Sequence, residues 1–315
     1  MKIIAVTPNP AVDLTVHASE WQRNRVNRGQ RLDKTAGGKG ISVAMILSDA
    51  GQKVIVTGWM GEHNDTTFVE EFNQKPNITD KFIRIAGDTR RCIKIIDDSN
   101  GETTDLNMPG EEIPVTAQQE LLNYLDAEVD KDTVLVFGGS LPAGIGKDFY
   151  AHMVNKYREK CRWLVVDTSD RALANLMANE KLPHVIKPNI HELESLCGKD
   201  IDDDTEIVAQ ARKFIERGVE LAVISMGSRG AWFVTKDEAI HAAPVRVKVA
   251  STVGAGDAMV AGTVRGLILG DDLATIAKTA TAYSAANIQH MGNGLPEDEQ
   301  VQKLINRVVI SQLPE

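Results

Sequence analysis

Cysteine is scarce in this sequence. Only Cys92, Cys161 and Cys197 occur in 315 residues, far apart and without a C-x-x-C pair. Such sparse cysteines argue against a disulfide framework or a zinc site, and they favour a reducing cytosol. The seven histidines show no metal-ligand spacing either. No apolar run approaches the roughly 18 residues needed to cross a bilayer, so we expect a cytoplasmic protein that does not span a membrane.

Positive charge is also in deficit, and two nucleotide-binding signatures are missing. The formal net charge is −9, so the surface repels nucleic acid and anionic lipid. No strand-like run ends in G-x-G-x-x-G, which disfavours a nucleotide-binding dehydrogenase, and no G-x-x-x-x-G-K-[ST] run predicts a P-loop. If such a protein binds phosphates, it needs local positive potential from helix N-termini and a few placed Arg or Lys side chains.

Strand-like and helix-like segments alternate along most of the chain, a rhythm typical of βαβ units and a parallel sheet. The expected strands are Ile3–Val6, Val54–Thr57, Val134–Phe137, Leu164–Val166, Val185–Ile186 and Ala222–Ser225, and the expected helices include Thr116–Val129, Lys147–Glu159 and Thr205–Arg217. No linker divides the sequence, so residues 1–315 should form one α/β domain. We predict a three-layer sandwich around a mostly parallel sheet, with the ligand site at the carboxyl ends of its strands.

One segment departs from this rhythm and predicts a small β-sheet lid. Residues 91–106 contain two β-prone runs around Asn100-Gly101, which is a strong hairpin signal. Together with residues 11–17, this hairpin should form an accessory sheet beside the main one. The C-terminal residues 310–315 should fray.

The most informative run is Ser251–Gly262, where three small residues precede an acid at the start of a predicted helix. Gly254, Ala255 and Gly256 let backbone N–H groups approach a ligand closely, and a helix N-terminus favours anions. Asp257 would repel a bound anion, but it suits a base that deprotonates a hydroxyl for attack on a phosphoryl group. The alternative is a tight glycine turn in which Asp257 is only an N-terminal helix acid.

Two further motifs stand at predicted helix starts. In Thr35–Gly40 the glycines allow close backbone approach and Lys39 adds charge, unless this is an ordinary loop with a solvated lysine. Asn189 and Glu192 are three residues apart, so an amide oxygen and a carboxylate can share one helix face. Such oxygens suit Mg²⁺, directly or through water. The alternative is that the two side chains form a capping box.

Polar groups in turns and loops complete the candidates. Ser225–Gly230 is either a turn that contacts a phosphate or nucleotide, or a plain hairpin turn. Ser140 follows a predicted strand, and it either faces a sugar or is an ordinary loop residue. Arg90 either holds a phosphate bidentately or lies on the surface. Asp13 either accepts hydrogen bonds from sugar hydroxyls or closes an Asx-turn.

Taken together and in this order, these motifs resemble the ribokinase-like carbohydrate kinases over nearly the whole chain, and Thr252–Asp257 is the most specific match. Within that family, Gly37–Gly40, Thr89-Arg90 and Gly139–Pro142 resemble the branch of 1-phosphofructokinases and tagatose-6-phosphate kinases. The resemblance implies ATP-dependent phosphorylation of a ketohexose monophosphate to a bisphosphate. Fructose 1-phosphate is the expected acceptor and tagatose 6-phosphate the alternative. A 6-phosphofructokinase and a free-sugar or nucleoside kinase are remoter possibilities.

The resemblance also implies a role for each candidate residue. Asp257 would be the catalytic base, and Gly254, Ala255 and Gly256 would form the anion hole for the transferring γ-phosphoryl group. The residues expected on the ATP side are Lys187, Asn189, Glu192, Ser225, Gly227, Gly230, Thr252 and Asn287, with Asn189 and Glu192 positioning Mg²⁺ through water. The residues expected on the sugar-phosphate side are Asp13, Arg25, Gly37, Gly38, Lys39, Ser42, Arg90 and Ser140. The lid would pair two subunits into a homodimer.

The sequence departs from the family pattern at Ser42 and at the pair Arg91-Cys92. Ser42 stands where the family usually has asparagine, and the shorter serine would reach a sugar through water or not at all. Arg91-Cys92 stands where 1-phosphofructokinases often have Ile-Asn and tagatose-6-phosphate kinases have Asn-Cys. Cys92 therefore favours the second group, and Arg91 fits neither. A binding module that had lost catalysis would not be expected to keep Asp257.

Overall fold

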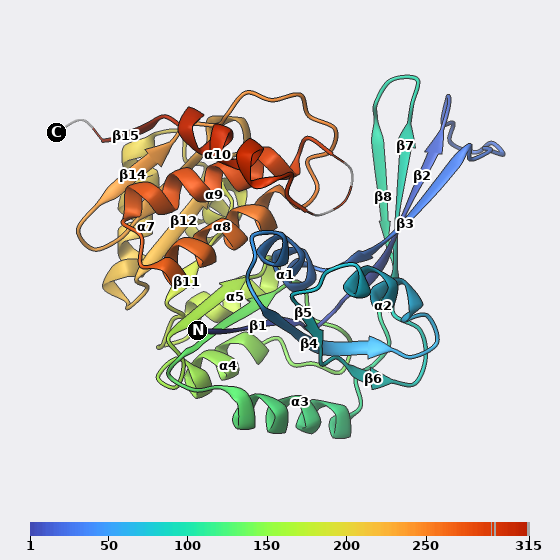
Figure 1. Cartoon of the computed structure of the whole chain (residues 1–315), viewed down its shortest axis with the longest axis horizontal. Helices are drawn as coiled ribbons and strands as arrows, with labels where there is room; N and C mark the ends of the chain where they lie inside the picture. The colour runs from blue at the N-terminus through green and yellow to red at the C-terminus, as the bar shows by residue number, and fades with distance from the viewer. Residues whose placement is uncertain (291, 293, 314–315) are drawn as a thin grey trace.

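A large mixed sheet runs through the body of the molecule in the computed structural model, which describes residues 1–290, 292 and 294–313 (Figure 1). Within these residues the sheet has eleven strands. In spatial order they are β15 (Ile310–Gln312), β14 (Ala239–Ala242), β13 (Ala231–Val234), β12 (Leu221–Ser225), β11 (Val185–Ile186), β10 (Trp163–Asp167), β9 (Thr133–Gly138), β1 (Lys2–Thr7), β4 (Val54–Gly61) and β5 (Ile78–Asp80), with β6 (Ile83–Ile85) beside β4. Neighbours from β12 to β5 are parallel, and β13, β14 and β15 add an antiparallel edge.

Helices cover both faces of this sheet, because its central strands are apolar on both sides. In β1, Ile3 and Ala5 join the core on one face, whereas Ile4 and Val6 join the core on the other. The first face is covered by α1 (Lys39–Asp49), α2 (Thr66–Asn73), α8 (Ala255–Leu269), α9 (Leu273–Asn287) and α10 (Asp298–Arg307), and the second by α3 (Val115–Glu128), α4 (Phe149–Tyr157), α5 (Asp170–Ala178), α6 (Ile190–Cys197) and α7 (Asp204–Glu216). The predicted three-layer α/β arrangement is confirmed.

The regular elements follow the sequence prediction closely. Each expected strand lies within β1, β4, β9, β10, β11 or β12, and the three expected helices coincide with α3, α4 and α7 to within two residues at each end. In the part of the chain that the structure describes, none of the helices has the length and apolar character required of a membrane span.

A second sheet projects from the body beside the large one (Figure 1). Its order is β3 (Arg31–Gly37), β2 (Ala11–Ala18), β7 (Arg91–Asp97) and β8 (Thr103–Asn107). The β7–β8 pair is the hairpin predicted around Asn100-Gly101, and β2 pairs with β7 in parallel. The sequence does not predict β3, because its polar run RLDKTAG lacks an apolar alternation and its final glycine motif indicates a loop.

The C-terminal end is ordered further than the sequence predicts. Strand β15 pairs with β14, with Ser311 opposite His241, so the expected fraying of residues 310–312 is wrong. The pairing satisfies backbone hydrogen bonds at a sheet edge, a gain that depends on the partner strand and not on local sequence. Residues 314 and 315 lie outside the described part of the chain.

Candidate active site

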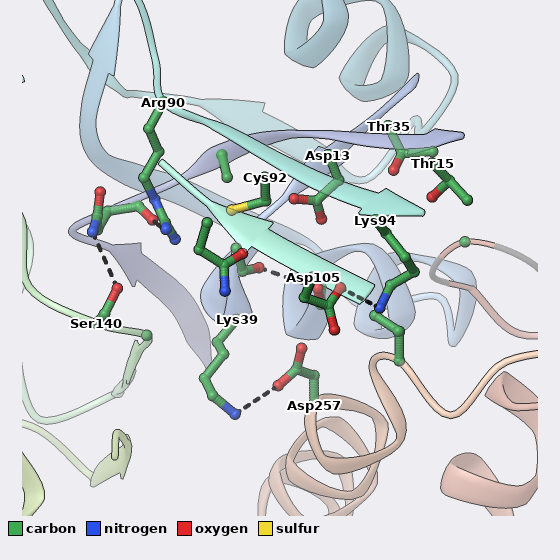
Figure 2. A pocket seen from close by; sticks show the side chains of 18 of the residues that line it. Asp13, Thr15, Thr35, Lys39, Arg90, Cys92, Lys94, Asp105, Ser140 and Asp257 are labelled. Atoms are coloured by element: carbon green, nitrogen blue, oxygen red, sulfur yellow. Dashed lines mark hydrogen bonds and ion pairs between the residues drawn. The ribbon is translucent and has the colours of Figure 1, made fainter. Parts of the chain in front are cut away.

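A pocket of about 460 Å³ lies where the small sheet meets the carboxyl ends of the parallel strands (Figure 2). Its walls come from the small sheet, from the loops that follow β1, β9 and β10, and from the starts of α1 and α8. Of the residues predicted from the sequence, the pocket brings together Asp13, Gly38, Lys39, Ser42, Arg90, Ser140 and Asp257. Parallel sheets favour this position for a ligand.

The start of α8 has the form expected of an anion site. Its N-cap Gly254 has a φ of 76°, in the left-handed region that favours glycine. Ala255 N–H donates to the Thr252 carbonyl at 3.4 Å. Among the described residues no side chain caps this end, so the N–H of Gly256 is left for a ligand. The Asp257 carboxylate lines the pocket and does not cap the helix, which argues against the purely structural alternative.

A buried acid that the sequence motifs do not include links the parts of the site. Asp167 ends β10 and is 3 % exposed. Its Oδ2 accepts a hydrogen bond from Lys39 Nζ at 3.0 Å, and its Oδ1 lies 3.4 Å from Lys187 Nζ. Lys39 Nζ also lies 3.4 Å from Oδ1 of Asp257. The available sequence signal for Asp167 is an acid at the carboxyl end of an apolar strand, WLVVD.

Burial and the neighbouring charges together set the pKa values of these groups. Burial raises the pKa of Asp257; Lys39 offsets part of this rise, and the neighbouring Asp167 adds to it. Burial alone would also raise the pKa of Asp167, but Lys187 and Lys39 outweigh it and hold that pKa below its ordinary value. Asp167 in turn raises the pKa of Lys39, so this lysine stays charged. Of the two carboxylates, Asp257 is therefore the one that more readily takes a proton.

Lys187 lies against the turn of small residues that precedes Asp257. A Cβ placed on Gly256 would lie 3.2 Å from Lys187 Nζ, so the glycine allows the ammonium group to approach the first turn of α8. Lys187 is 6 % exposed. The predicted ATP-side lysine thus adds positive charge beside the predicted anion hole.

The Asp13 carboxylate fills the space beside Gly37. A Cβ on Gly37 would lie 2.2 Å from Asp13 Oδ2, so the glycine is required where β2 and β3 hold this carboxylate. Burial raises the pKa of Asp13 to about 6, although Arg90 and Lys94 act against the rise. Asp13 lies inside a strand, which argues against an Asx-turn and leaves its oxygens to the pocket.

Arg90 points into the pocket from the start of β7 (Figure 2). Its Nε donates to the Pro10 carbonyl at 3.3 Å and its Nη2 to the Asn9 carbonyl at 3.2 Å. Asn9 Nδ2 donates in turn to Ser140 Oγ at 3.1 Å. Because these carbonyls are neutral, they orient the guanidinium without cancelling its charge, which suits an anionic ligand.

The β7–β8 hairpin of the small sheet adds four pocket residues to the predicted site, and of these the sequence pattern singles out Cys92 alone. Cys92 and Lys94 face the pocket from β7, and Asp105 and Asn107 face it from β8. Lys94 Nζ donates to Asp105 Oδ1 at 2.6 Å across the two strands. Strand alternation starting from Arg90 would have found Cys92 and Lys94, but their neighbours on β8 follow only from the register.

Arg25 and Arg91 lie away from the pocket, and Ser42 lines it with its hydroxyl bonded to the backbone. Arg25 lies in the connection between β2 and β3 and lines a separate surface hollow, so this chain alone does not bring it to the pocket. Ser42 Oγ donates to the Gly38 carbonyl at 3.1 Å in the first turn of α1. Arg91 is directed away from the pocket and pairs with Asp88 at 2.8 Å.

Asn189 and Glu192 form the capping box that was the structural alternative. Asn189 Oδ1 accepts from the Glu192 N–H at 2.9 Å, and Glu192 Oε2 accepts from the Asn189 N–H at 2.8 Å. Both residues also line a second pocket of about 650 Å³. No cluster of three His, Cys, Asp or Glu side chains suited to a metal occurs in the described ranges, so a cation here would need ligands from a nucleotide or water.

Of the remaining predicted ATP-side residues, Ser225, Gly227 and Gly230 belong to a turn at the end of β12, and Asn287 ends α9. Ser225–Gly230 connects β12 to β13 as a hairpin, and a Cβ on Gly230 would lie 2.2 Å from the Ala242 carbonyl oxygen. Asn287 is 1 % exposed, and its Nδ2 donates to the Val253 carbonyl at 3.0 Å. Asn287 therefore anchors the loop that leads into α8.

Known proteins are similar to this sequence over its full length. A sequence model of the pfkB family carbohydrate kinases matches residues 7–300. The chain is 36 % identical to a 1-phosphofructokinase from Xanthomonas campestris, over 100 % of this chain and 99 % of that protein. It is 30 % identical to a tagatose-6-phosphate kinase from Staphylococcus epidermidis, over 99 % of this chain and 100 % of that protein.

Solved structures share the fold as well. A possible 1-phosphofructokinase from Thermotoga maritima matches with a TM-score of 0.86 and 26 % identity, over 100 % of both chains. Phosphofructokinase-2 from Escherichia coli matches with a TM-score of 0.90, over 97 % of this chain and 99 % of that one; at 23 % identity this likeness concerns the fold alone. With the family match and the full-length relatives, these findings confirm the resemblance seen in the sequence. The chain belongs to the pfkB family of carbohydrate kinases and is an ATP-dependent phosphotransferase.

Proposed function

We propose that this kinase phosphorylates a ketohexose monophosphate to a bisphosphate, with fructose 1-phosphate as the acceptor. The observation that carries the proposal is Arg90, which shares the pocket with Asp257 and whose charge faces neutral carbonyls. With a free sugar, the nearby Asp13 carboxylate would be the anion that acts on this cation, whereas a sugar monophosphate supplies a dianion. Full-length relatives at 33–36 % identity that are named 1-phosphofructokinase add support.

Asp257 is the base in this proposal. It takes the proton from the acceptor hydroxyl as that oxygen attacks the γ-phosphorus of ATP. Its burial raises its pKa, which makes it a stronger base than an exposed aspartate. The N–H groups of Gly254 and Gly256, with Lys187 beside them, receive the charge on the transferring phosphoryl oxygens, and the long 3.4 Å bond from Ala255 N–H to the Thr252 carbonyl lets that group turn to them as well.

The sugar phosphate binds across the pocket. Arg90 and Ser140 hold the phosphate, and Asp13 accepts hydrogen bonds from the sugar hydroxyls. Lys39 and the N–H groups after Gly37 complete the sugar side. Ser42, whose hydroxyl bonds to a backbone carbonyl, contacts the sugar through water.

ATP binds at the ends of β11 and β12, beside Asn189, Ser225 and Gly227. When bound, Mg²⁺ neutralises charge on the nucleotide phosphates. Glu192 fits a water-mediated role toward it, since the capping box uses Oε2 and a carboxylate has a second oxygen. Asn189, whose Oδ1 already accepts the Glu192 N–H, orients that carboxylate.

Tagatose 6-phosphate is the second candidate acceptor. Cys92, which favours the tagatose-6-phosphate kinases, lines the pocket, and a full-length relative with that name is 30 % identical. Tagatose is the C4 epimer of fructose, and the phosphate of tagatose 6-phosphate lies at the opposite end of the sugar from that of fructose 1-phosphate. The two substrates therefore present different hydroxyls to Asp257 and Asp13.

A coupled ADP-release assay tests the choice of acceptor. It compares kcat/KM for fructose 1-phosphate, tagatose 6-phosphate, fructose 6-phosphate and free fructose. We expect fructose 1-phosphate to exceed each of the others by at least about tenfold. A higher value for tagatose 6-phosphate would select the second candidate, and a higher value for free fructose would overturn the sugar-phosphate assignment.

We also propose that two chains dimerise through the small sheet. The face opposite the pocket is mostly apolar: six of the residues that alternate with the pocket residues are aliphatic, and Lys34, Arg91 and Thr104 lie among them. The six aliphatic residues are Leu14, Val16, Leu32, Ile93, Ile95 and Leu106. Leu32 and Leu106 are 61 % and 54 % exposed. The other four are half-buried, and apolar side chains gathered on one face in this way suit a contact surface.

A further inference from the structure

Two lysines from different elements converge on one buried carboxylate. Asp167 ends β10, Lys39 starts α1, and Lys187 follows β11. The carboxylate divides its oxygens between them, with Oδ2 at 3.0 Å from Lys39 Nζ and Oδ1 at 3.4 Å from Lys187 Nζ. Asp167 and Lys187 are 3 % and 6 % exposed. A buried ammonium group needs a countercharge, and Asp167 supplies it.

Each lysine has a second neighbour in the phosphoryl-transfer site. Lys39 Nζ lies 3.4 Å from Oδ1 of Asp257, so the two acids share this lysine and Asp167 has the shorter contact. Lys187 Nζ lies 3.2 Å from the point where a Cβ on Gly256 would stand, beside the first turn of α8. The position of the Asp167 carboxylate therefore sets where both ammonium groups lie.

We propose that Asp167 is a positioning residue of this kinase: it holds Lys187 against the N-terminal turn of α8 and draws Lys39 away from a full ion pair with Asp257. The inference rests on the proposed role of Asp257 as the base. A carboxylate locked in a full ion pair is a weak base, and an anion hole whose lysine has moved loses positive charge. One buried acid thus serves both requirements.

The arrangement predicts a pH signature that a merely structural residue would not have. The charged groups that act on Asp257 are Lys39 from α1, Asp167 from β10 and Lys187, which follows β11; Asp13 on β2 interacts with it more weakly across the pocket. Asp167 raises the pKa of Asp257, whereas both lysines lower it. Without the charge of Asp167, the lysines act unopposed and the pKa of Asp257 falls.

The test is the pH profile of single-turnover phosphoryl transfer in Asp167→Asn, with the preferred sugar phosphate of the wild type. We expect the rate to drop about 10- to 100-fold and its acid limb to move about one pH unit lower. Asp80→Asn is the matched control, since Asp80 ends β5 and pairs with Arg84 at 2.6 Å outside the residues that line the pocket. It should lower the melting temperature and leave the acid limb in place.

Three results would overturn the inference. They are an acid limb unchanged from the wild type, a rate equal to that of the wild type, and full recovery of the Asp167→Asn rate in excess Mg²⁺, which would make Asp167 a metal ligand. If Asp167→Asn does not fold, Lys39→Met gives the opposite signature. Removing this lysine should move the acid limb to higher pH, and an unmoved limb would contradict the inference.

An Asp257→Asn arm separates this inference from the proposed function. Near-normal transfer in Asp257→Asn would remove the base assignment and the inference with it. An inactive Asp257→Asn together with a normal Asp167→Asn would remove the inference alone.

Discussion

Three carboxylates in the site, those of Asp13, Asp167 and Asp257, differ in pKa because their charged neighbours differ. Burial raises the pKa of Asp257 and of Asp13, to about 6 for Asp13, whereas Lys187 and Lys39 hold the pKa of Asp167 down against the same effect. The result is a division of roles at the scale of single residues. Asp257 is suited to take a proton, Asp13 to accept hydrogen bonds, and Asp167 to keep its charge.

The affinity for the sugar phosphate should depend on pH through Asp13. Because its pKa is raised to about 6, Asp13 binds a proton as the pH falls through 6 and then loses an acceptor for sugar hydroxyls. We expect KM for the sugar phosphate to rise about tenfold between pH 7 and pH 5.

Asp13→Asn is the control for this dependence. The variant should have a raised KM, and the pH dependence of its KM should lack the contribution of Asp13. The second ionisation of the substrate phosphate, near pH 6, should affect KM in both proteins. Identical pH profiles for the wild type and the variant would show that Asp13 does not titrate in binding.

Sequence reasoning found the site residues that have a local signature and missed those that depend on register. Gly254–Asp257 and Gly37–Gly40 were predicted because small residues before a helix are rare and have a physical use. Asp167 and Lys94 have no such local signature: the place of each in its sheet brings Lys94 to the pocket wall and Asp167 into contact with Lys39. Arg25 was predicted from the resemblance alone, and the single chain leaves it outside the pocket.

At the scale of elements, the helices and central strands are predictable from local sequence, whereas the edge strands are not. The central strands are apolar and the helices amphipathic, so periodicity predicts both. Strands β3 and β15 are short of apolar residues, and they exist because a neighbouring strand offers backbone partners. Edge strands of this kind cannot be read from local sequence.

The β7–β8 hairpin should move over the pocket when the sugar phosphate binds. The hairpin carries the pocket residues Lys94 and Asp105, and Asp97 at its end accepts hydrogen bonds from the N–H groups of Glu20 and Trp21 at 2.9 Å each. The hairpin and the β2–β3 connection are therefore tied together, and we expect them to close as one lid that keeps water from the γ-phosphate.

Limited proteolysis measures this closure. The sugar phosphate should slow cleavage at residues 99–101, and free fructose, which lacks the anion for Arg90, should not. Equal cleavage with and without the sugar phosphate would argue against closure.

At the scale of the whole molecule, the two sheets have different tasks. The large sheet, covered on both faces by helices, fixes the carboxyl ends that carry Asp167 and Lys187. The small sheet presents a polar face to the pocket and a mostly apolar face away from it. The second face has a use only if another surface covers it, which is the basis for proposing a dimer.

A charge on the apolar face should break the dimer. Leu106→Glu places a carboxylate in the proposed interface, and light scattering should report a mass that falls from that of two chains to that of one. Leu269→Glu is the matched control, because Leu269 is also 54 % exposed but lies at the end of α8. A wild-type mass of one chain, or equal effects of the two substitutions, would contradict the proposed interface.

The most direct test of the account is the single-turnover rate of Asp257→Asn with ATP and the preferred sugar phosphate. The substitution keeps the shape of the side chain and removes the base. We predict a loss of at least about 10²- to 10⁴-fold, with ATP binding and melting temperature unchanged. A near-normal rate in a folded protein that binds ATP would contradict the central claim that Asp257 deprotonates the acceptor hydroxyl.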